Sequence, residues 1–128
     1  MTANETMEKE LPFDPKDNPW PEIRRARIQK LLPEAMRLSG IDAWLVACRE
    51  NNNDPLAIHV GGEVAGAPAL ILFLLRDDDL SSVAFFPWGE STAAGELKVH
   101  DRIVEYERGG NVWDLAADEL RAANPGAI

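Results

Sequence analysis

The hydrophobic positions of the chain follow two different spacings, and these spacings predict that helices and strands alternate. Between Glu22 and Ser39 apolar residues recur at helical spacing, and Pro21 suits the first turn of that helix. Pro33 is expected to kink the helix, because proline removes one backbone hydrogen bond. Gly40 is expected to cap its end. A second helix is predicted after Asn111, a good N-cap residue.

Each predicted helix has an apolar stripe and a polar face. The apolar positions of the first helix are Ile23, Ile28, Leu31, Leu32, Ala35, Met36 and Leu38. The basic positions among them are Arg24, Arg25, Arg27, Lys30 and Arg37. Solvated cover for an amphipathic helix explains these cations better than an anionic partner does. The predicted buried stripe of the second helix is Val112, Trp113, Ala116, Ala117 and Leu120.

Strand patterns lie between the two helices. Strands are predicted from Asp42 to Ala47 or Cys48, over 68–75, over 81–86 and over 102–107. The run 68–75 is apolar throughout, which is typical of a strand covered on both faces. The second and third strands are expected to pair antiparallel, with Arg76–Asp79 as the polar turn between them. A loop is expected over 87–95. The alternation predicts a single-domain α/β layer fold, and Ala127–Ile128 is expected to begin a further strand.

Composition and charge exclude several classes of function. The chain has 128 residues and a formal net charge of −9, from 22 acidic and 13 basic residues. This balance disfavours nucleic-acid binding, which depends on Lys and Arg. No apolar run approaches the roughly 20 residues of a membrane helix, and residues 1–16 lack the apolar core of a secretory signal. Residues 1–19 are expected to be a flexible lead-in, and a single cysteine fits a cytoplasmic protein.

The run from Arg49 to Pro55 is the main candidate for function, because a dense cluster of polar side chains follows an apolar strand. A structural account has the Asn and Asp side chains stabilising a turn before Pro55. A functional account has Arg49 binding a carboxylate while the amides bind a peptide-like ligand. The pattern supports both accounts about equally. The candidate site residues are Arg49, Glu50, Asn51, Asn52, Asn53, Asp54 and His59.

The remaining candidates are better explained by structure than by chemistry. Cys48 is expected to be a small buried residue at a strand end rather than a nucleophile. The run Asp77–Asp79 is expected to be a solvated turn rather than a cation site. His59 and His100 are far apart in the sequence and lie in no metal motif, so a structural or exposed role is favoured for His59 over ligand contact. Gly61 and Gly62 favour a close approach of backbones over a phosphate-binding loop.

At these residues the chain resembles a known family. The segments that carry the resemblance are Met36–Gly40, Ile41–Val46, Cys48–Leu56 and His59–Glu63. They are similar to the N-terminal domain of the creatinase, prolidase and aminopeptidase P family, the two-domain "pita-bread" metallohydrolases. The similarity extends over about residues 21–128, and the Arg-Glu-Asn-Asn-Asn-Asp-Pro run resembles a bacterial Xaa-Pro peptidase-like branch.

The resemblance implies a mixed sheet flanked by helices over residues 20–128, followed by a catalytic domain beyond this chain. That domain would hold two divalent metal ions (Mn, Co or Zn), so no catalytic or metal-binding residue is expected here. The segment Arg49–Glu63 would shape access for a peptide or small amide substrate, and the domain would help to form a homodimer. The alternative hypothesis is a free-standing α/β module that binds a small carboxylate or a protein partner.

Overall fold

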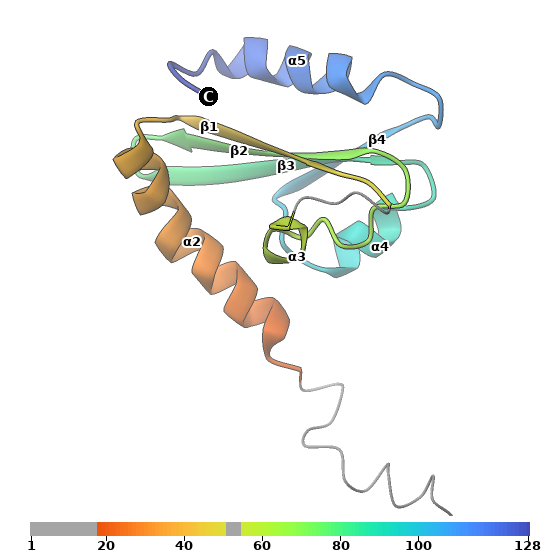
Figure 1. Cartoon of the computed structure of the whole chain (residues 1–128), viewed down its shortest axis with the longest axis horizontal. Helices are drawn as coiled ribbons and strands as arrows, with labels where there is room; N and C mark the ends of the chain where they lie inside the picture. The colour runs from red at the N-terminus through yellow and green to blue at the C-terminus, as the bar shows by residue number, and fades with distance from the viewer. Residues whose placement is uncertain (1–17, 51–54) are drawn as a thin grey trace, which may run out of the picture.

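A four-stranded mixed sheet lies between two layers of helices in the computed structural model, which describes residues 18–50 and 55–128 (Figure 1). The strand order is β1-β2-β3-β4. The strands are β1 (Ala43–Cys48), β2 (Ala69–Arg76), β3 (Asp79–Pro87) and β4 (Arg102–Tyr106). The helices are α2 (Trp20–Ser39), α3 (Ala57–Val60), α4 (Ser91–Glu96) and α5 (Val112–Ala123). The predicted α/β fold with a mixed sheet flanked by helices is confirmed.

The register of the sheet explains why β2 is apolar on both faces. β2 pairs antiparallel with β1 and with β3, so it is a central strand. Helices cover both of its faces (Figure 1). Its alternate residues divide between two cores: Ile71 and Phe73 face α2, α3 and α4, whereas Leu70 and Leu72 face α5. All four are fully buried. Burial of each such side chain contributes on the order of 2 kcal/mol to folding.

The parallel pairing of β3 with β4 requires a crossover, and α4 lies within that crossover. The predicted loop over 87–95 is therefore wrong in part, because Ser91–Glu96 is helical. The hydroxyl of Ser91 donates to the carboxylate of Glu105 on β4, which ties the crossover to the strand that follows it. The helix is too short for its apolar periodicity to appear in the sequence.

The first helix confirms its predicted extent, but only part of its predicted apolar set faces the core. Gly40 caps it with φ +70°, and the helix continues through Pro33, whose ring is buried. Arg24, Ile28 and Met36 are buried, whereas Leu31 and Leu38 are 61% and 82% exposed. Residues 24, 28, 32 and 36 are spaced by four and so share one stripe. The sequence interpretation was wrong because it assigned Arg24 to the solvated face.

The last helix begins as predicted, with one correction to its buried stripe. The Asn111 side chain accepts hydrogen bonds from the backbone N–H groups of Trp113 and Asp114, which confirms the cap. Val112 and Ala116 are buried, but Trp113 is 54% exposed. Trp113 points away from the sheet because it lies about 100° around the helix from Val112. On the exposed face of this helix, Arg121 pairs with Asp118.

Candidate functional site

The carboxyl ends of three strands meet at one edge of the sheet, and this edge is the candidate site. β1 and β3 both run antiparallel to β2, and β4 runs parallel to β3, so these three strands point the same way. The carboxyl ends of these strands lie on the same side of the sheet (Figure 1). Arg49 and Glu50 follow β1, Trp88 follows β3, and Arg108 follows β4. Loops at the carboxyl ends of strands commonly form ligand sites in α/β folds.

Arg49 and Glu50 lie directly after β1, and both are exposed. The backbone N–H of Glu50 donates to the Gly66 carbonyl at 3.1 Å, which joins the start of the segment to its return before β2. The carboxylate of Glu90 accepts from the N–H groups of Gly66 and Ala67 at 2.6 and 3.2 Å. These bonds join Glu50 to the backbone before β2, and that backbone to the residue before α4. The predicted site residues Asn51, Asn52, Asn53 and Asp54 lie outside the described residues.

His59, the last predicted site residue, lies on α3 and is exposed. Its ring meets that of Trp20 edge-on, with 6.4 Å between the ring centroids. Trp20 is the first residue of α2, so this contact places His59 against the start of the long helix. His59 therefore packs against α2, whereas Arg49 and Glu50 follow the end of β1.

Arg24 holds the α3 segment on α2, and the sequence interpretation missed it. Its side chain is 2% exposed, and its Nη1 donates to the Ile58 carbonyl at 2.9 Å and to Glu63 at 2.5 Å. Its guanidinium also lies 5.6 Å from the centroid of the Trp20 ring. The countercharge, the carbonyl and the aromatic face together make the burial of this cation tolerable. The signal in the sequence is its position one turn before Ile28, on the buried stripe.

His100 lies against the end of α3, close enough to feel the charge of Arg24. Its Nε2 is 3.4 Å from the Gly61 carbonyl oxygen. Burial lowers the pKa of His100, and the Arg24 charge acts in the same direction, while the Gly61 contact opposes both. Within residues 18–50 and 55–128, His100 Nδ1 and Arg24 Nε are buried without a hydrogen-bond partner.

Close packing fixes the turn after α3. Gly61 has φ +80°, and a Cβ there would lie 2.9 Å from His100 Nε2. A Cβ on Gly62 would overlap the Sγ of Cys48, which is buried at the end of β1. The glycines allow close packing, but against side chains rather than against another backbone as predicted. The buried position of Cys48 is confirmed.

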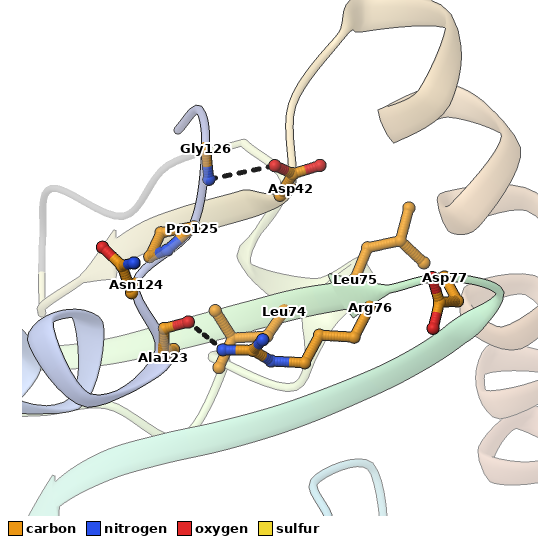
Figure 2. Close-up of a pocket in the computed structure, with 9 residues that line it drawn as sticks. All are labelled: Asp42, Leu74, Leu75, Arg76, Asp77, Ala123, Asn124, Pro125 and Gly126. Carbon is orange, nitrogen blue, oxygen red and sulfur yellow. Dashed lines mark hydrogen bonds between the residues drawn. The ribbon is translucent and has the colours of Figure 1, made fainter.

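A cavity of about 310 Å³ lies at the opposite edge of the sheet, where α5 ends (Figure 2). The Asp42 carboxylate accepts from the Gly126 N–H at 3.0 Å, and Arg76 donates to the Ala123 carbonyl. The Ala127 carbonyl accepts from the N–H groups of Asp42 and Ala43 at 2.8 and 3.1 Å. These bonds hold the C-terminal segment against the start of β1. Polar groups of this cavity thus form hydrogen bonds within the chain, and we assign the cavity no ligand.

The described residues do not offer a metal site. No three His, Cys, Asp or Glu side chains in this part of the chain come together as ligands. Asp77 and Asp78 form an exposed turn, as predicted, and Asp79 begins β3. Asp78 pairs with Arg37 at 3.0 Å. Nor does any helix in the described ranges have the length and apolarity needed to cross a membrane.

Comparison of the chain with models of known protein families, with curated proteins and with solved structures found no match. The family resemblance therefore stays a prediction that rests on residues 36–63, and similarity to a characterised protein adds nothing to it.

Proposed function

We propose that this chain is a non-catalytic domain of the creatinase, prolidase and aminopeptidase P type, which forms a wall of an active site carried by a separate catalytic domain. The observation that supports this proposal is the attachment of the segment between Arg49 and Gly66. The Glu50–Gly66 bond closes one end, Glu90 binds the returning backbone, and Arg24 holds the middle at Ile58 and Glu63. The bond of Glu50 fixes the backbone at the end of β1, so Arg49 and Glu50 can present their side chains from a fixed position.

The exposed charges at the strand end suit substrate selection rather than bond cleavage. A guanidinium such as that of Arg49 binds carboxylates with two parallel hydrogen bonds, and an adjacent carboxylate disfavours a second anion. In this proposal Arg49 and Glu50 select a peptide or small amide by its charge. The two divalent ions that the family uses (Mn, Co or Zn) do not fit the described residues, and we assign them to the catalytic domain.

The proposal includes two partners and a compartment. The partners are the catalytic domain of the same protein and a second copy of the chain, and the compartment is the cytoplasm. Leu31 and Leu38 on α2 are exposed in the single chain. They support a partner contact on this helix, because apolar patches on a protein surface commonly mark contacts. The net charge of −9 continues to disfavour nucleic acid.

Full-length protein and this chain alone together test the proposal. The chain alone with Mn²⁺ should not hydrolyse an Xaa-Pro dipeptide, whereas the protein that also carries the catalytic domain should. In the latter, Arg49→Gln should raise KM roughly tenfold with little change in kcat, because uniform binding is lost. Arg121→Gln, at an exposed position on α5, is the matched control. Hydrolysis by the chain alone, or an unchanged KM for Arg49→Gln, would overturn the proposal.

A second candidate function is a free-standing module that binds a small carboxylate. It is favoured by a cavity near the same edge of the sheet, which Arg108 and Trp113 help to line. A reading frame that stops after Ile128 would support this function against the first.

A further inference from the structure

A cavity of about 410 Å³ lies where the segment before β2, the end of β4 and the first turn of α5 come together. Its volume falls within the usual range for small-molecule sites, roughly 300–1,000 Å³. None of the predicted site residues contributes to it. The residues that line it are Ala67, Pro68, Tyr106, Arg108, Gly109, Gly110, Asn111, Val112 and Trp113.

The wall of the cavity is mainly apolar and held in place by the fold. Tyr106 is buried on β4, and its hydroxyl donates to the Pro68 carbonyl. Burial raises the pKa of Tyr106, and the nearby Glu90 adds to this effect, so the hydroxyl stays protonated and keeps its bond. Trp113 is 54% exposed, although Val112 beside it is buried. A half-exposed indole on a fixed helix offers a flat apolar surface to a ring.

One cation lies among these apolar residues. The Nε of Arg108 donates to the Trp88 carbonyl at 3.4 Å. In the part of the chain that the structure describes, its other guanidinium N–H groups have no protein partner. A guanidinium with both terminal nitrogens available matches the two oxygens of a carboxylate.

The surroundings favour a singly charged ligand. The N-terminus of α5 does not supply a second donor site, because the Asn111 side chain already accepts from the Trp113 and Asp114 N–H groups. Asp114 in the first turn and Glu107 next to Arg108 add negative charge. One guanidinium can balance a carboxylate here, whereas a phosphate dianion would face uncompensated repulsion.

We propose that this cavity binds a small carboxylic acid that carries an apolar ring, with the carboxylate on Arg108 and the ring against Trp113. The site is distinct from the Arg49 segment and does not depend on a catalytic domain. A ligand of about fifteen non-hydrogen atoms at drug-like efficiency would bind with a Kd of about 1 mM.

Titration of the isotope-labelled chain with N-acetyl-L-phenylalanine, followed by amide NMR shifts, tests the inference. Saturable shifts are expected at Gly109, Gly110 and Trp113. The neutral N-acetyl-L-phenylalanine amide tests the carboxylate, acetate tests the ring, and phenyl phosphate tests the preference for a single charge. Each should bind at least about fivefold more weakly, a difference of about 1 kcal/mol.

Variants test whether binding occurs in this cavity rather than elsewhere on the surface. Arg108→Gln and Trp113→Ala should each weaken binding at least about fivefold, while Arg121→Gln on the same helix should not. A dispersed NMR spectrum of each variant shows that it has folded. The inference is overturned if shifts do not saturate by about 10 mM, if the amide analogue binds equally well, or if Arg108→Gln binds as the parent does. Arg49→Gln should leave this binding unchanged, so the result is independent of the proposed role of Arg49 beside a catalytic domain.

Discussion

Arg24 and Glu63 form an ion pair across 39 positions of sequence, and only one of the two partners is fully buried. The Arg24 side chain is 2% exposed and the Glu63 side chain 30%. The pair is therefore asymmetric: water can solvate the carboxylate if the cation is removed, but it cannot reach the guanidinium if the carboxylate is neutralised. This asymmetry decides which substitution damages the fold more.

We expect Glu63→Gln to destabilise the chain more than Arg24→Leu. Glu63→Gln leaves a buried cation without its countercharge, at a cost of about 3 kcal/mol, whereas an apolar replacement of the cation costs about 1 kcal/mol. Urea unfolding measures both. Asp118→Asn, in the exposed pair with Arg121, is the control and should cost less than about 0.5 kcal/mol. The reverse order for the first two variants would show that the pair does not carry this asymmetry.

Local patterns predicted the elements well, and long-range contacts explain the errors. The cap at Asn111 can be predicted from the sequence because its bonds reach only two and three residues along the chain. Arg24 was placed on the wrong face because its partners, Ile58 and Glu63, lie on a distant segment. A cation on a buried stripe is stabilised only by tertiary contacts that spacing does not reveal.

The candidate site shows the same division. The polar strand end at Arg49 and Glu50 was visible in the sequence, because it interrupts an apolar run. The contact of His100 with Gly61, and the cavity beside Trp113, could not be predicted. The first involves a residue before β4 and the second lies after it, and both depend on contacts between segments far apart in the sequence.

Stability should fall in mildly acidic solution because of His100. Burial lowers its folded pKa below the ordinary value of 6.5, so the unfolded chain binds a proton more readily than the folded chain does. Its contribution is therefore fully present above about pH 6.5 and is lost as the pH falls from there toward the folded pKa. His100→Gln should flatten this part of the profile. Unfolding free energies between pH 7.5 and 5 measure the effect.

Charged side chains near His100 also act on its pKa. Arg24 from α2 lowers the pKa of His100, whereas Asp101 and Glu63 raise it. His59→Gln, which replaces the exposed histidine on α3, is the matched control. Equal profiles for His100→Gln and the parent chain would contradict the prediction.

Gly62 and Cys48 should show strong coupling when both are changed. A Cβ on Gly62 would overlap the Cys48 Sγ, so Gly62→Ala should cost roughly 2 kcal/mol through overpacking. Removing the sulfur with Cys48→Ala makes room for the new methyl group. The double variant should therefore be at least about 1 kcal/mol more stable than the sum of the single effects predicts. A double-mutant cycle of urea unfolding measures this coupling, and additivity would refute the close approach.

The exposed apolar face of α2 should drive self-association, as the proposed homodimer requires. Leu31 and Leu38 lie two turns apart and are 61% and 82% exposed. Beside them, a cavity of about 220 Å³ lies between Leu32, Ile41 and Trp44, next to the edge strand β1. Burying both leucines at a two-fold contact would contribute roughly 2 kcal/mol from each subunit.

Sedimentation equilibrium at about 100 µM should then detect dimers, which have a Kd in the micromolar range for a contact of modest area. The variant Leu31→Glu/Leu38→Glu should be monomeric, because it places like charges at the contact. Ile58→Glu, at a residue 49% exposed on α3, is the matched control and should still form dimers. A monomeric parent chain at this concentration would exclude α2 as a surface for self-association, and equal association of all three proteins would place the contact elsewhere.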